Sequence, residues 1–316
     1  MVSVITPIYN VEAFIERCAR SLMEQTLEDV EFIFVDDCSP DRSTDILQRV
    51  VAEYPQRNVQ ILHHEVNRGL PASRNTGLAN ATGEYIFHCD SDDYMERDAL
   101  EKMYEAAKQE DADIVYSDWY LTFPKKERYM SCPAYSTSEE ALRGLLHGAM
   151  KYNVWNKLVR RNLYTEKYIT FPEGHGMGED MTMILLFARA SKVTYLPQGT
   201  YHYVRQNENA FTAPRQGAMG ELYEDLRFNA ERVIAALTGS VTDEDLACFK
   251  LNVKYPFLIS NRREDYERWN RWFPEANSYI TSHQVSTRAR FLEACASKKF
   301  WMILRIHSYM LQVVQR

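Results

Sequence analysis

The chain has 316 residues, of which 45% are hydrophobic and 26% charged, as expected for a globular protein with one large domain and an appendage, or with two domains. Its net charge of −7 argues against a dedicated nucleic-acid binder, and no run approaches the roughly 18 apolar residues of a membrane-spanning helix. The six cysteines are widely spaced, and none forms a pair with metal-ligand spacing, which favours reduced structural thiols in a cytoplasmic protein.

Short apolar runs alternate with helical periodicity through the first 120 or so residues. Because the sequence is already strand-like at Met1, we expect no signal peptide. Strands are predicted at 2–6, 30–35, 59–63, 85–88 and 114–117. Helices are predicted between them at 11–25, 43–54, 70–78 and 98–109. This alternation predicts an α/β fold, with a mostly parallel central sheet and helices on both faces.

The alternation stops after residue 118. Segments 122–138 and 154–163 are irregular or mixed, although a capped helix is predicted between them at 138–146. A further helix is predicted at 179–190, and short strands at 193–196 and 200–205 would extend the sheet. From residue 221 onward the pattern is mainly helical, so we expect a helical region at the carboxyl end of the chain.

A cluster of acids follows the predicted strand at 85–88. Asp90, Asp92 and Asp93 place three carboxylates within four residues. Burying such a cluster without a counter-charge carries a large desolvation cost. A hard divalent cation that also takes phosphate oxygens is the natural partner. The segment therefore predicts a site that handles a diphosphate.

Two more polar clusters follow predicted strands, namely Tyr9-Asn10 after the first and Asp36-Asp37 after the second. The carboxyl ends of parallel strands meet at one edge of the sheet, where such folds bind ligands. All three clusters are therefore expected at that edge. Pro7-Ile8-Tyr9-Asn10 stands where a Rossmann or P-loop enzyme would carry a glycine-rich phosphate loop, so both classes are excluded.

Four segments resemble, in order and spacing, motifs of the family 2 inverting glycosyltransferases, whose fold is called GT-A. They are 4–10 (VITPIYN), 35–39 (VDDCS), 67–77 (NRGLPASRNTG) and 90–93 (DSDD), which together span about the first 95 residues. The resemblance implies a catalytic domain over residues 1–215, with a nucleotide-binding half at 1–118 and an acceptor half at 119–215. A mainly helical region would follow at 216–316.

The resemblance also implies how the nucleotide is bound. Pro7 and Tyr9 would form the wall for the base, with Asn10 beside them. Asp36 would accept a hydrogen bond from the imide N–H of uracil or thymine. Asp37 would contact the ribose or cap the following turn, since Asp after a strand is commonly a turn residue.

The diphosphate end of the donor would involve the later motifs. Asn67 lies in the turn that approaches the nucleotide. Arg74 would contact the diphosphate or hold an acidic neighbour, because arginine suits bidentate recognition of either group. Asp90, with Ser91 beside it, would meet the ribose or a sugar hydroxyl. Asp92 would hold Mn²⁺ or Mg²⁺, which neutralises the departing diphosphate.

Gly178-Glu179-Asp180 resembles the Glu-Asp pair in which the aspartate is the catalytic base of this family. Asp180 would take the proton from the acceptor hydroxyl. Glu179 would orient the acceptor or raise the pKa of Asp180 by like-charge proximity. The alternative is an ordinary carboxylate at a helix start, where the helix dipole favours negative charge.

Two further segments resemble the family in the acceptor half. Trp155 would stack on a sugar face or belong to the core, and Lys157 would reach a phosphate or the acceptor. His202 would ligate the metal and Arg205 would bind phosphate, together with the following segment 207–209. Strand alternation places His202 and Arg205 on opposite faces, so these side chains are not all expected in one site.

The predicted function is transfer of a hexose, from a UDP-sugar or similar donor, to a saccharide or lipid-linked acceptor in polysaccharide or glycolipid synthesis. The alternatives are a nucleotide-sugar-binding protein without activity and a pyrophosphorylase-like nucleotidyltransferase. A pyrophosphorylase would need a basic glycine-rich loop after the first strand, and a binding protein would not need Glu179-Asp180. The basic, amphipathic segment 288–316 would contact the inner face of the membrane, or pack on its own domain or on the twin subunit of a homodimer.

Overall fold

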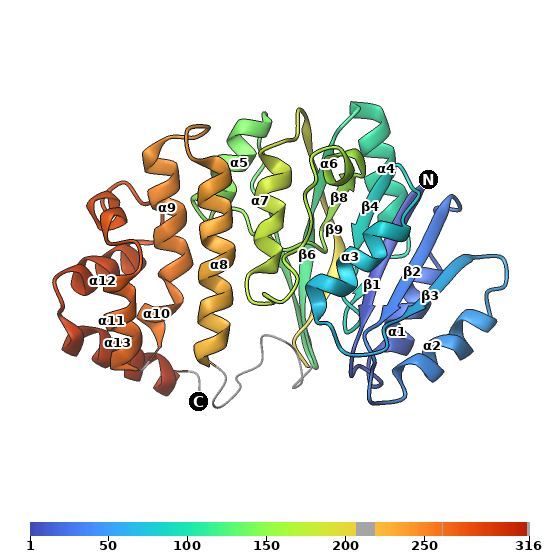
Figure 1. Cartoon of the computed structure of the whole chain (residues 1–316), viewed down its shortest axis with the longest axis horizontal. Coiled ribbons are helices and arrows are strands. Elements are labelled where there is room, and N and C mark those ends of the chain that lie inside the picture. The colour runs from blue at the N-terminus through green and yellow to red at the C-terminus, as the bar shows by residue number, and fades with distance from the viewer. Residues whose placement is uncertain (207–218, 261, 315–316) are drawn as a thin grey trace. The chain divides into compact units, whose positions relative to one another are not determined.

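The computed structural model describes residues 1–206, 219–260 and 262–314. The chain divides into two compact units (Figure 1). The first comprises Met1–Ser138 and Tyr152–Asn229, and the second comprises Glu139–Lys151 and Ala230–Arg316. The expected boundary at residue 215 and the segment 207–209 lie outside the described residues, and the division into a catalytic domain and a helical region stays a prediction. All six cysteines are free thiols.

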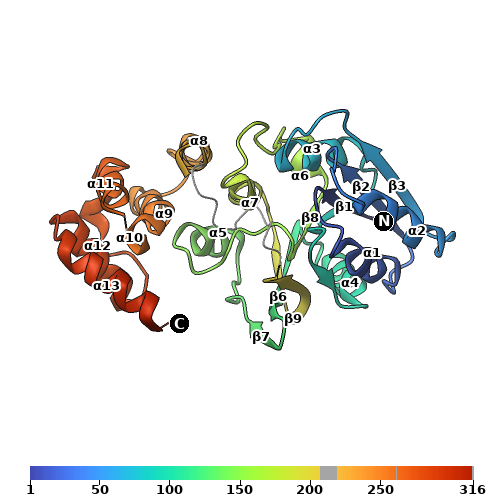
Figure 2. The same ribbon diagram turned by 90° about the horizontal axis from the view of Figure 1, so that it is seen from below.

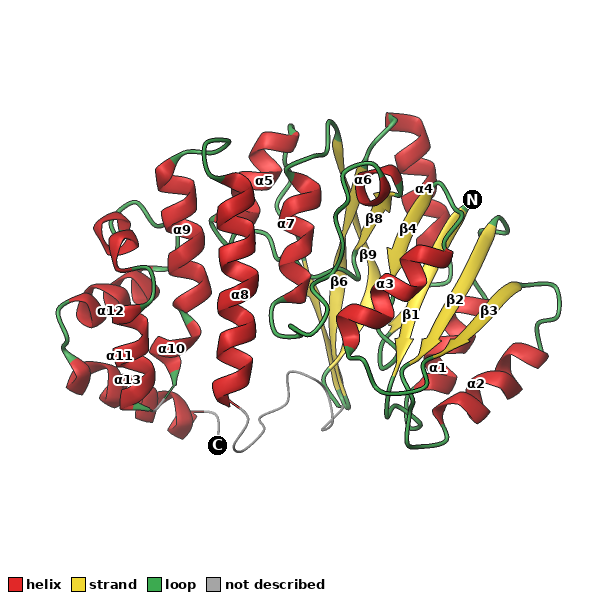
Figure 3. Cartoon of the chain, viewed as in Figure 1, coloured by secondary structure: helices red, strands yellow, loops and turns green. Residues whose placement is uncertain are grey.

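One sheet of nine strands organises the first unit (Figure 3). Its strands are β1 Val2–Ile8, β2 Val30–Asp36, β3 Asn58–His63, β4 Tyr85–His88, β5 Tyr94–Met95, β6 Ile114–Phe123, β7 Lys126–Met130, β8 Lys157–Arg160 and β9 Val193–Val204. Their spatial order is β3-β2-β1-β4-β8-β6-β9-β5, with β7 beside β6. The first four strands are mutually parallel, as the alternating pattern predicts.

An antiparallel strand that the sequence did not predict lies next to β4. Strand β8 inserts between β4 and β6, so that Val159 pairs with Ile86 on one side and Ile114 on the other. With only four residues, β8 gives little periodicity to read. The two strands expected at 193–196 and 200–205 form one continuous strand, in which the pairing with β6 shifts register at Asp118.

Helices cover both faces of the sheet, and Figure 2 shows α3 and α6 on one face and α1 and α4 on the other. The helices that lie wholly or mostly in this unit are α1 Ile15–Met23, α2 Ser43–Ala52, α3 Leu70–Asn80, α4 Ala99–Glu110, α6 Asn162–Thr165, the 3-10 helix η1 Glu179–Met181, α7 Thr182–Phe187 and α8 Met219–Leu237. Helix α3 packs so closely on β1 that a side chain at Gly77 would overlap Ile5. Every residue of β1 is buried, which places this strand in the core.

The second unit consists of helices, as expected for the carboxyl end of the chain. They are α5 Ser138–Leu146, α9 Asp243–Lys254, α10 Pro256–Ile259, α11 Arg263–Arg271, the 3-10 helix η2 Pro274–Tyr279, α12 Thr287–Ser297 and α13 Trp301–Val314, together with the end of α8. Helix α9 begins with a capping box between Thr242 and Asp245. Within the described ranges, no helix has the length and apolar character to span a bilayer.

Candidate functional site

The register of the central strands brings the three polar clusters to one edge of the sheet. Ile8 at the end of β1 pairs with Asp36 at the end of β2, and Ile5 pairs with His88 at the end of β4. Because these strands are parallel, the residues that follow them leave the sheet on the same side. Pro7 lies within β1 and is buried. This placement agrees with the expectation drawn from the sequence.

Tyr9 and Asp36 have different surroundings at this edge. Tyr9 is 49% exposed, which leaves it accessible to a planar ligand. The next residue, Asn10, has a φ of 56° and donates its backbone N–H to Ser39 Oγ at 2.8 Å. The carboxylate of Asp36 accepts the Ser39 N–H at 2.9 Å through Oδ1 and lies 3.0 Å from Nδ1 of His63 through Oδ2. The same turn thus fixes both of these neighbours of Tyr9.

Asp37 holds the turn that carries Asn67. Its Oδ1 accepts the backbone N–H of Arg68 at 2.8 Å, and its Oδ2 accepts that of Gly69 at 2.7 Å. Oδ1 also lies 2.6 Å from Nδ1 of His64. The φ of Gly69 is +85°, a conformation that glycine adopts at no steric cost. These contacts hold the turn at 67–69 rather than the turn directly after Asp37, so both expected roles of Asp37, contact with the ribose and cap of the following turn, stay predictions.

Arg74 joins the acid cluster to the later Glu-Asp pair. Its side chain lies on α3 and is almost completely buried, with 1% of the residue exposed. Nη2 donates to Oδ1 of Asp90 at 2.9 Å, and Nε donates to Oε1 of Glu179 at 3.2 Å. One guanidinium therefore bridges two carboxylates that are 89 positions apart in the chain (179 minus 90). This bridge identifies Arg74 as the holder of an acidic neighbour, one of its two expected roles.

Glu179 and Asp180 are weakened as acids in this environment. Gly178, with a φ of 83°, leads into η1, where Glu179 is buried and Asp180 is half-buried. Burial raises the pKa of Glu179 to about 7, opposed by the charge of Arg74. Burial also raises the pKa of Asp180 to about 6, opposed by Arg74 and Lys157. Asp180 is therefore mostly ionised at neutral pH, yet basic enough to take up a proton.

The acid cluster itself divides into two parts. Asp93 is fully buried, where its carboxylate accepts the hydroxyl of Tyr201 at 2.9 Å and the backbone N–H of Val204 at 2.7 Å. Burial, together with the nearby Asp92 and Asp90, raises the pKa of Asp93 well above its usual range. Asp90 and Asp92 keep partial exposure to solvent, whereas Asp93 anchors the cluster to β9.

The residues fit a hard cation only in part. Carboxylate oxygens such as those of Asp92 are the ligands that Mg²⁺ and Mn²⁺ prefer. Within the described ranges, no group of three or more His, Cys, Asp or Glu side chains is arranged to hold a metal by itself. The described residues thus offer an incomplete set of ligands, which phosphate oxygens of a bound ligand could extend.

His202 is not arranged to complete that set. Its Nδ1 lies 2.8 Å from Glu127, and its Nε2 lies 2.9 Å from Glu96. Its ring stacks on Tyr94 and Tyr120, with centroid distances of 4.1 and 4.6 Å. Both ring nitrogens are engaged by carboxylates of β7 and of the residue after β5, so the expected metal role is not supported. These two short strands were absent from the expected elements.

Trp155 is part of the aromatic core of the unit. It is 7% exposed, and its ring stacks on Tyr201 and Tyr203, with centroid distances of 4.7 and 5.4 Å. It also packs edge-on against Trp119 at 5.0 Å. Of the two roles considered for Trp155, this packing matches the core role rather than stacking on a sugar.

Lys157 is also buried, with 1% of the residue exposed. Its Nζ donates to the backbone oxygen of Asn153 at 2.7 Å and to Oδ1 of Asn156 at 2.9 Å. Burial lowers the pKa of Lys157 to about 8, opposed by Cys132 and Asp180. The charge of Lys157 in turn opposes the rise in the pKa of Asp180 that burial causes.

Tyr201 is a site residue that the sequence reasoning missed. Its hydroxyl accepts the backbone N–H of Asp90 at 3.0 Å while donating to Asp93. It thereby fixes the backbone at the start of the acid cluster. Because side chains alternate along a strand, Tyr201 lies on the face opposite His202. This alternation was the one feature of the sequence that could have indicated its place.

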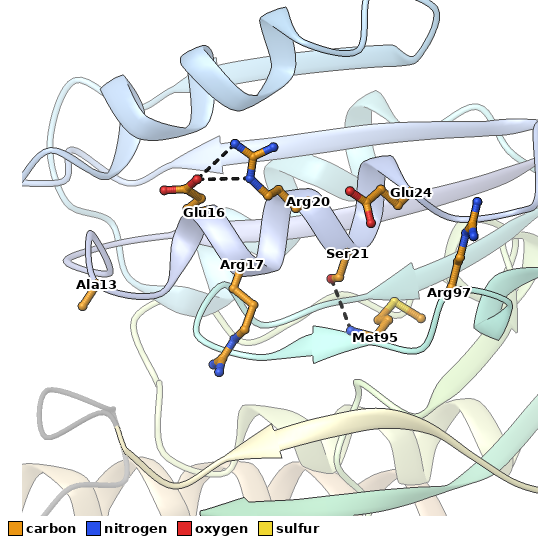
Figure 4. Close-up of a pocket in the computed structure, with 8 residues that line it drawn as sticks. All are labelled: Ala13, Glu16, Arg17, Arg20, Ser21, Glu24, Met95 and Arg97. Atoms are coloured by element: carbon orange, nitrogen blue, oxygen red, sulfur yellow. Dashed lines mark hydrogen bonds and ion pairs between the residues drawn. The ribbon is translucent and has the colours of Figure 1, made fainter. Parts of the chain in front are cut away.

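A separate shallow hollow of about 550 Å³ lies along α1 and β5 (Figure 4). The eight side chains that line it are Ala13, Glu16, Arg17, Arg20, Ser21, Glu24, Met95 and Arg97. None of them belongs to the expected site. Arg20 is already paired with Glu16 at 3.0 Å and with Glu53 at 2.8 Å. The hollow is a surface feature of α1 that meets the acid cluster at Arg17, whose Nη2 donates to the backbone oxygen of Asp92 at 3.3 Å.

Comparison with known proteins agrees with this arrangement. A family model described as glycosyl transferase family 2 matches residues 3–182. The uncharacterized glycosyltransferase EpsJ of Bacillus subtilis is 34% identical over 276 residues, which are 83% of this chain and 78% of the relative. Glycosyltransferase GlyG of Streptococcus pneumoniae is 28% identical over 314 residues, covering 95% of this chain and 96% of the relative.

Solved structures match the same fold. The structure of TarS residues 1–349 from S. aureus in complex with UDP-GlcNAc has a TM-score of 0.69 and 21% identity, covering 98% of this chain and 91% of that chain. A mannosyltransferase from Pyrobaculum calidifontis, in complex with GDP-Man and Mn²⁺, has a TM-score of 0.54 and 18% identity, covering 98% and 83%. At these identities the likeness shows the fold, and it confirms the predicted GT-A class.

Proposed function

The chain belongs to glycosyl transferase family 2, and from this premise we propose that it transfers a hexose from a UDP-sugar to an acceptor hydroxyl with inversion at the anomeric carbon. The observation that carries the proposal is the Arg74 bridge. It ties Asp90, at the donor end, to the Glu179-Asp180 pair at 2.9 and 3.2 Å. A nucleotide-binding protein without activity would have no need for that coupling.

The donor would bind along the edge of the sheet. The half-exposed Tyr9 would form the wall for the base together with Pro7, with Asn10 beside them and Asp36 as acceptor for the imide N–H. The turn at Asn67, held by Asp37, would approach the ribose and diphosphate. Asp90 and Ser91 would lie against the ribose or the sugar. The likeness to TarS in complex with UDP-GlcNAc supports uridine as the base.

Asp92 would hold Mn²⁺ or Mg²⁺ together with the donor's phosphate oxygens. When bound, the metal would stabilise the negative charge on the departing diphosphate. The incomplete set of ligands among the described residues is consistent with this sharing, because a hard cation needs about six oxygen ligands in total. The likeness to a mannosyltransferase in complex with GDP-Man and Mn²⁺ points the same way.

Asp180 would act as the base in a single displacement. It would remove the proton of the acceptor hydroxyl while that oxygen forms a bond to the anomeric carbon. The bond from that carbon to the diphosphate breaks on the opposite side, and its electron pair leaves with the nucleoside diphosphate. A base with a pKa of about 6 is ionised at neutral pH and still accepts the proton as the bond forms. Glu179, fixed by Arg74, would hold η1 in place.

The acceptor would be a saccharide or a lipid-linked saccharide in polysaccharide or glycolipid synthesis. Lys157 would favour the ionised form of Asp180 rather than touch the acceptor, since both it and Trp155 are buried. The enzyme would act in the cytoplasm, and a lipid-linked acceptor would bring it to the inner face of the membrane. The second unit would mediate this contact or the formation of a homodimer.

The test separates donor binding from transfer. Thermal stabilisation by a panel of UDP- and GDP-sugars, with and without Mn²⁺, would identify the donor. Hydrolysis of that donor, and its transfer to candidate saccharides, would then be measured for the wild-type protein and for Asp180→Asn. We expect the variant to be stabilised by the donor as strongly as wild type but to lose transfer by at least about 100-fold. Asp45→Asn, an exposed acid on α2, is the matched control. Full transfer by Asp180→Asn would remove Asp180 from the mechanism.

A further inference from the structure

Exposed apolar side chains are concentrated near the end of the described chain. Among the described residues thirteen large hydrophobic side chains are exposed, and seven of them fall within residues 291–310. These seven are Phe291, Phe300, Met302, Ile303, Ile306, Tyr309 and Met310. Single exposed hydrophobic residues are ordinary, but a group of this kind on one segment marks an interaction surface.

Helix α13 has two faces of different character. Leu304 and Ser308 are 0% and 2% exposed, so this face packs within the second unit. Met302, Ile306 and Tyr309 recur at helical spacing on the outer face, where they are 75%, 54% and 65% exposed. Packing of α13 on its own unit therefore accounts for the inner face and leaves the apolar outer face uncovered.

The charges on the segment that carries this face are almost entirely positive. Residues 288–316 contain six Arg or Lys and one acid, although the whole chain has a net charge of −7. The acid, Glu293, is fully buried, and its Oε1 lies 2.9 Å from Nδ1 of His283. Lys298, Lys299 and Arg305 are exposed. The surface therefore combines apolar side chains with a cationic border.

We propose that the outer face of α13 lies on a bilayer that contains anionic lipid. Met302, Ile306 and Tyr309 would enter the boundary between headgroups and acyl chains, and Lys298, Lys299 and Arg305 would contact the lipid phosphates. A second copy of the chain fits this face less well, because a two-fold contact would bring like charges together. The inference names the surface through which the proposed enzyme reaches a lipid-linked acceptor, and it rests on the proposed function only for that purpose.

Sedimentation of the full chain with vesicles tests the proposal. We expect binding to vesicles of phosphatidylcholine with one third phosphatidylglycerol, little binding to phosphatidylcholine alone, and a loss of binding at high salt. Met302→Ser with Ile306→Ser should weaken binding by at least about 10-fold, because apolar burial supplies much of the affinity. Lys298→Gln with Lys299→Gln should weaken it only for the anionic vesicles. Val66→Ser, which changes an apolar residue that is 63% exposed in the first unit, is the control.

Two results would overturn the proposal. One is equal binding of the wild-type protein and the Met302/Ile306 double variant to anionic vesicles. The other is a stable dimer in solution that the same double variant dissociates, since a second copy would then cover this face. Donor-induced thermal stabilisation should be unchanged in all these variants. A failure of vesicle binding is thus distinguished from a failure of the proposed glycosyl transfer.

Discussion

Replacement of Arg74 by glutamine should destabilise the protein in a pH-dependent way. The guanidinium is buried and contacts Asp90 at 2.9 Å and Glu179 at 3.2 Å. Glutamine removes the positive charge and leaves two carboxylates near each other without a counter-charge. Removal of one partner from a buried ion pair typically costs roughly 3–5 kcal/mol. We expect a loss of this size when both carboxylates are ionised.

The pH dependence follows from Glu179. Its pKa is about 7 in the intact protein, where the charge of Arg74 lowers it against the effect of burial. In Arg74→Gln the pKa of Glu179 lies even further above its value in the unfolded chain. The stability of the variant therefore continues to fall with rising pH until the pH passes this higher pKa. The difference between variant and wild type therefore grows above about pH 7, by roughly 1.4 kcal/mol for each unit of added pKa shift.

Urea unfolding at about pH 6 and about pH 9 measures this difference. We expect the loss in Arg74→Gln to be larger at the higher pH by at least roughly 1 kcal/mol. Arg74→Lys keeps the charge without the planar geometry, so its free energy of unfolding should lie between those of the wild-type protein and Arg74→Gln. Arg49→Gln, on the exposed side of α2, controls for general loss of positive charge. An equal loss at both pH values would refute the assigned coupling between Arg74 and Glu179.

Three further predictions concern the reaction. The kcat/KM for transfer should fall as pH drops through about 6, because Asp180 must be ionised to accept a proton; a flat profile over that range would contradict this. A chelator should abolish transfer by the wild-type protein, and added Mn²⁺ or Mg²⁺ should restore it, as measured by release of the nucleoside diphosphate. In Asp92→Asn neither the chelator nor the added metal should change that release. Tyr9→Ala should weaken UDP binding by roughly 1–3 kcal/mol in calorimetry, the range for loss of a stacked base, whereas unchanged affinity would exclude stacking.

The edge of the sheet was predictable because its signals are local. Apolar runs end at Ile8, Asp36 and His88, and parallel pairing alone brings the following residues together. The strand at 85–88 has the bounds that the sequence predicted. The placement of Tyr9, Asp36 and the acid cluster therefore required only periodicity and the geometry of parallel strands.

The remaining features depend on contacts between distant segments. The hydrogen bond from Arg74 to Glu179 spans 105 positions, and no local pattern records it. The burial of Lys157 depends on β8, which has four residues and lies between two strands from elsewhere in the chain. His202 meets carboxylates of β7 and of the residue after β5, two strands too short or too polar to be recognised. In each case the sequence drew attention to the residue, but it did not show which distant segment the residue contacts.

The central position of β8 has a consequence for folding during synthesis. Strand β4 is fully buried in the finished protein, yet one of its edges stays unpaired until Lys157–Arg160 has left the ribosome. Until then a nascent chain would present an apolar strand edge, a template for pairing with other chains. The amino-terminal strands must therefore wait for a segment made much later. Ribosome-bound intermediates that stop before Lys157 are the stage at which aggregation, or the need for a chaperone, should be greatest.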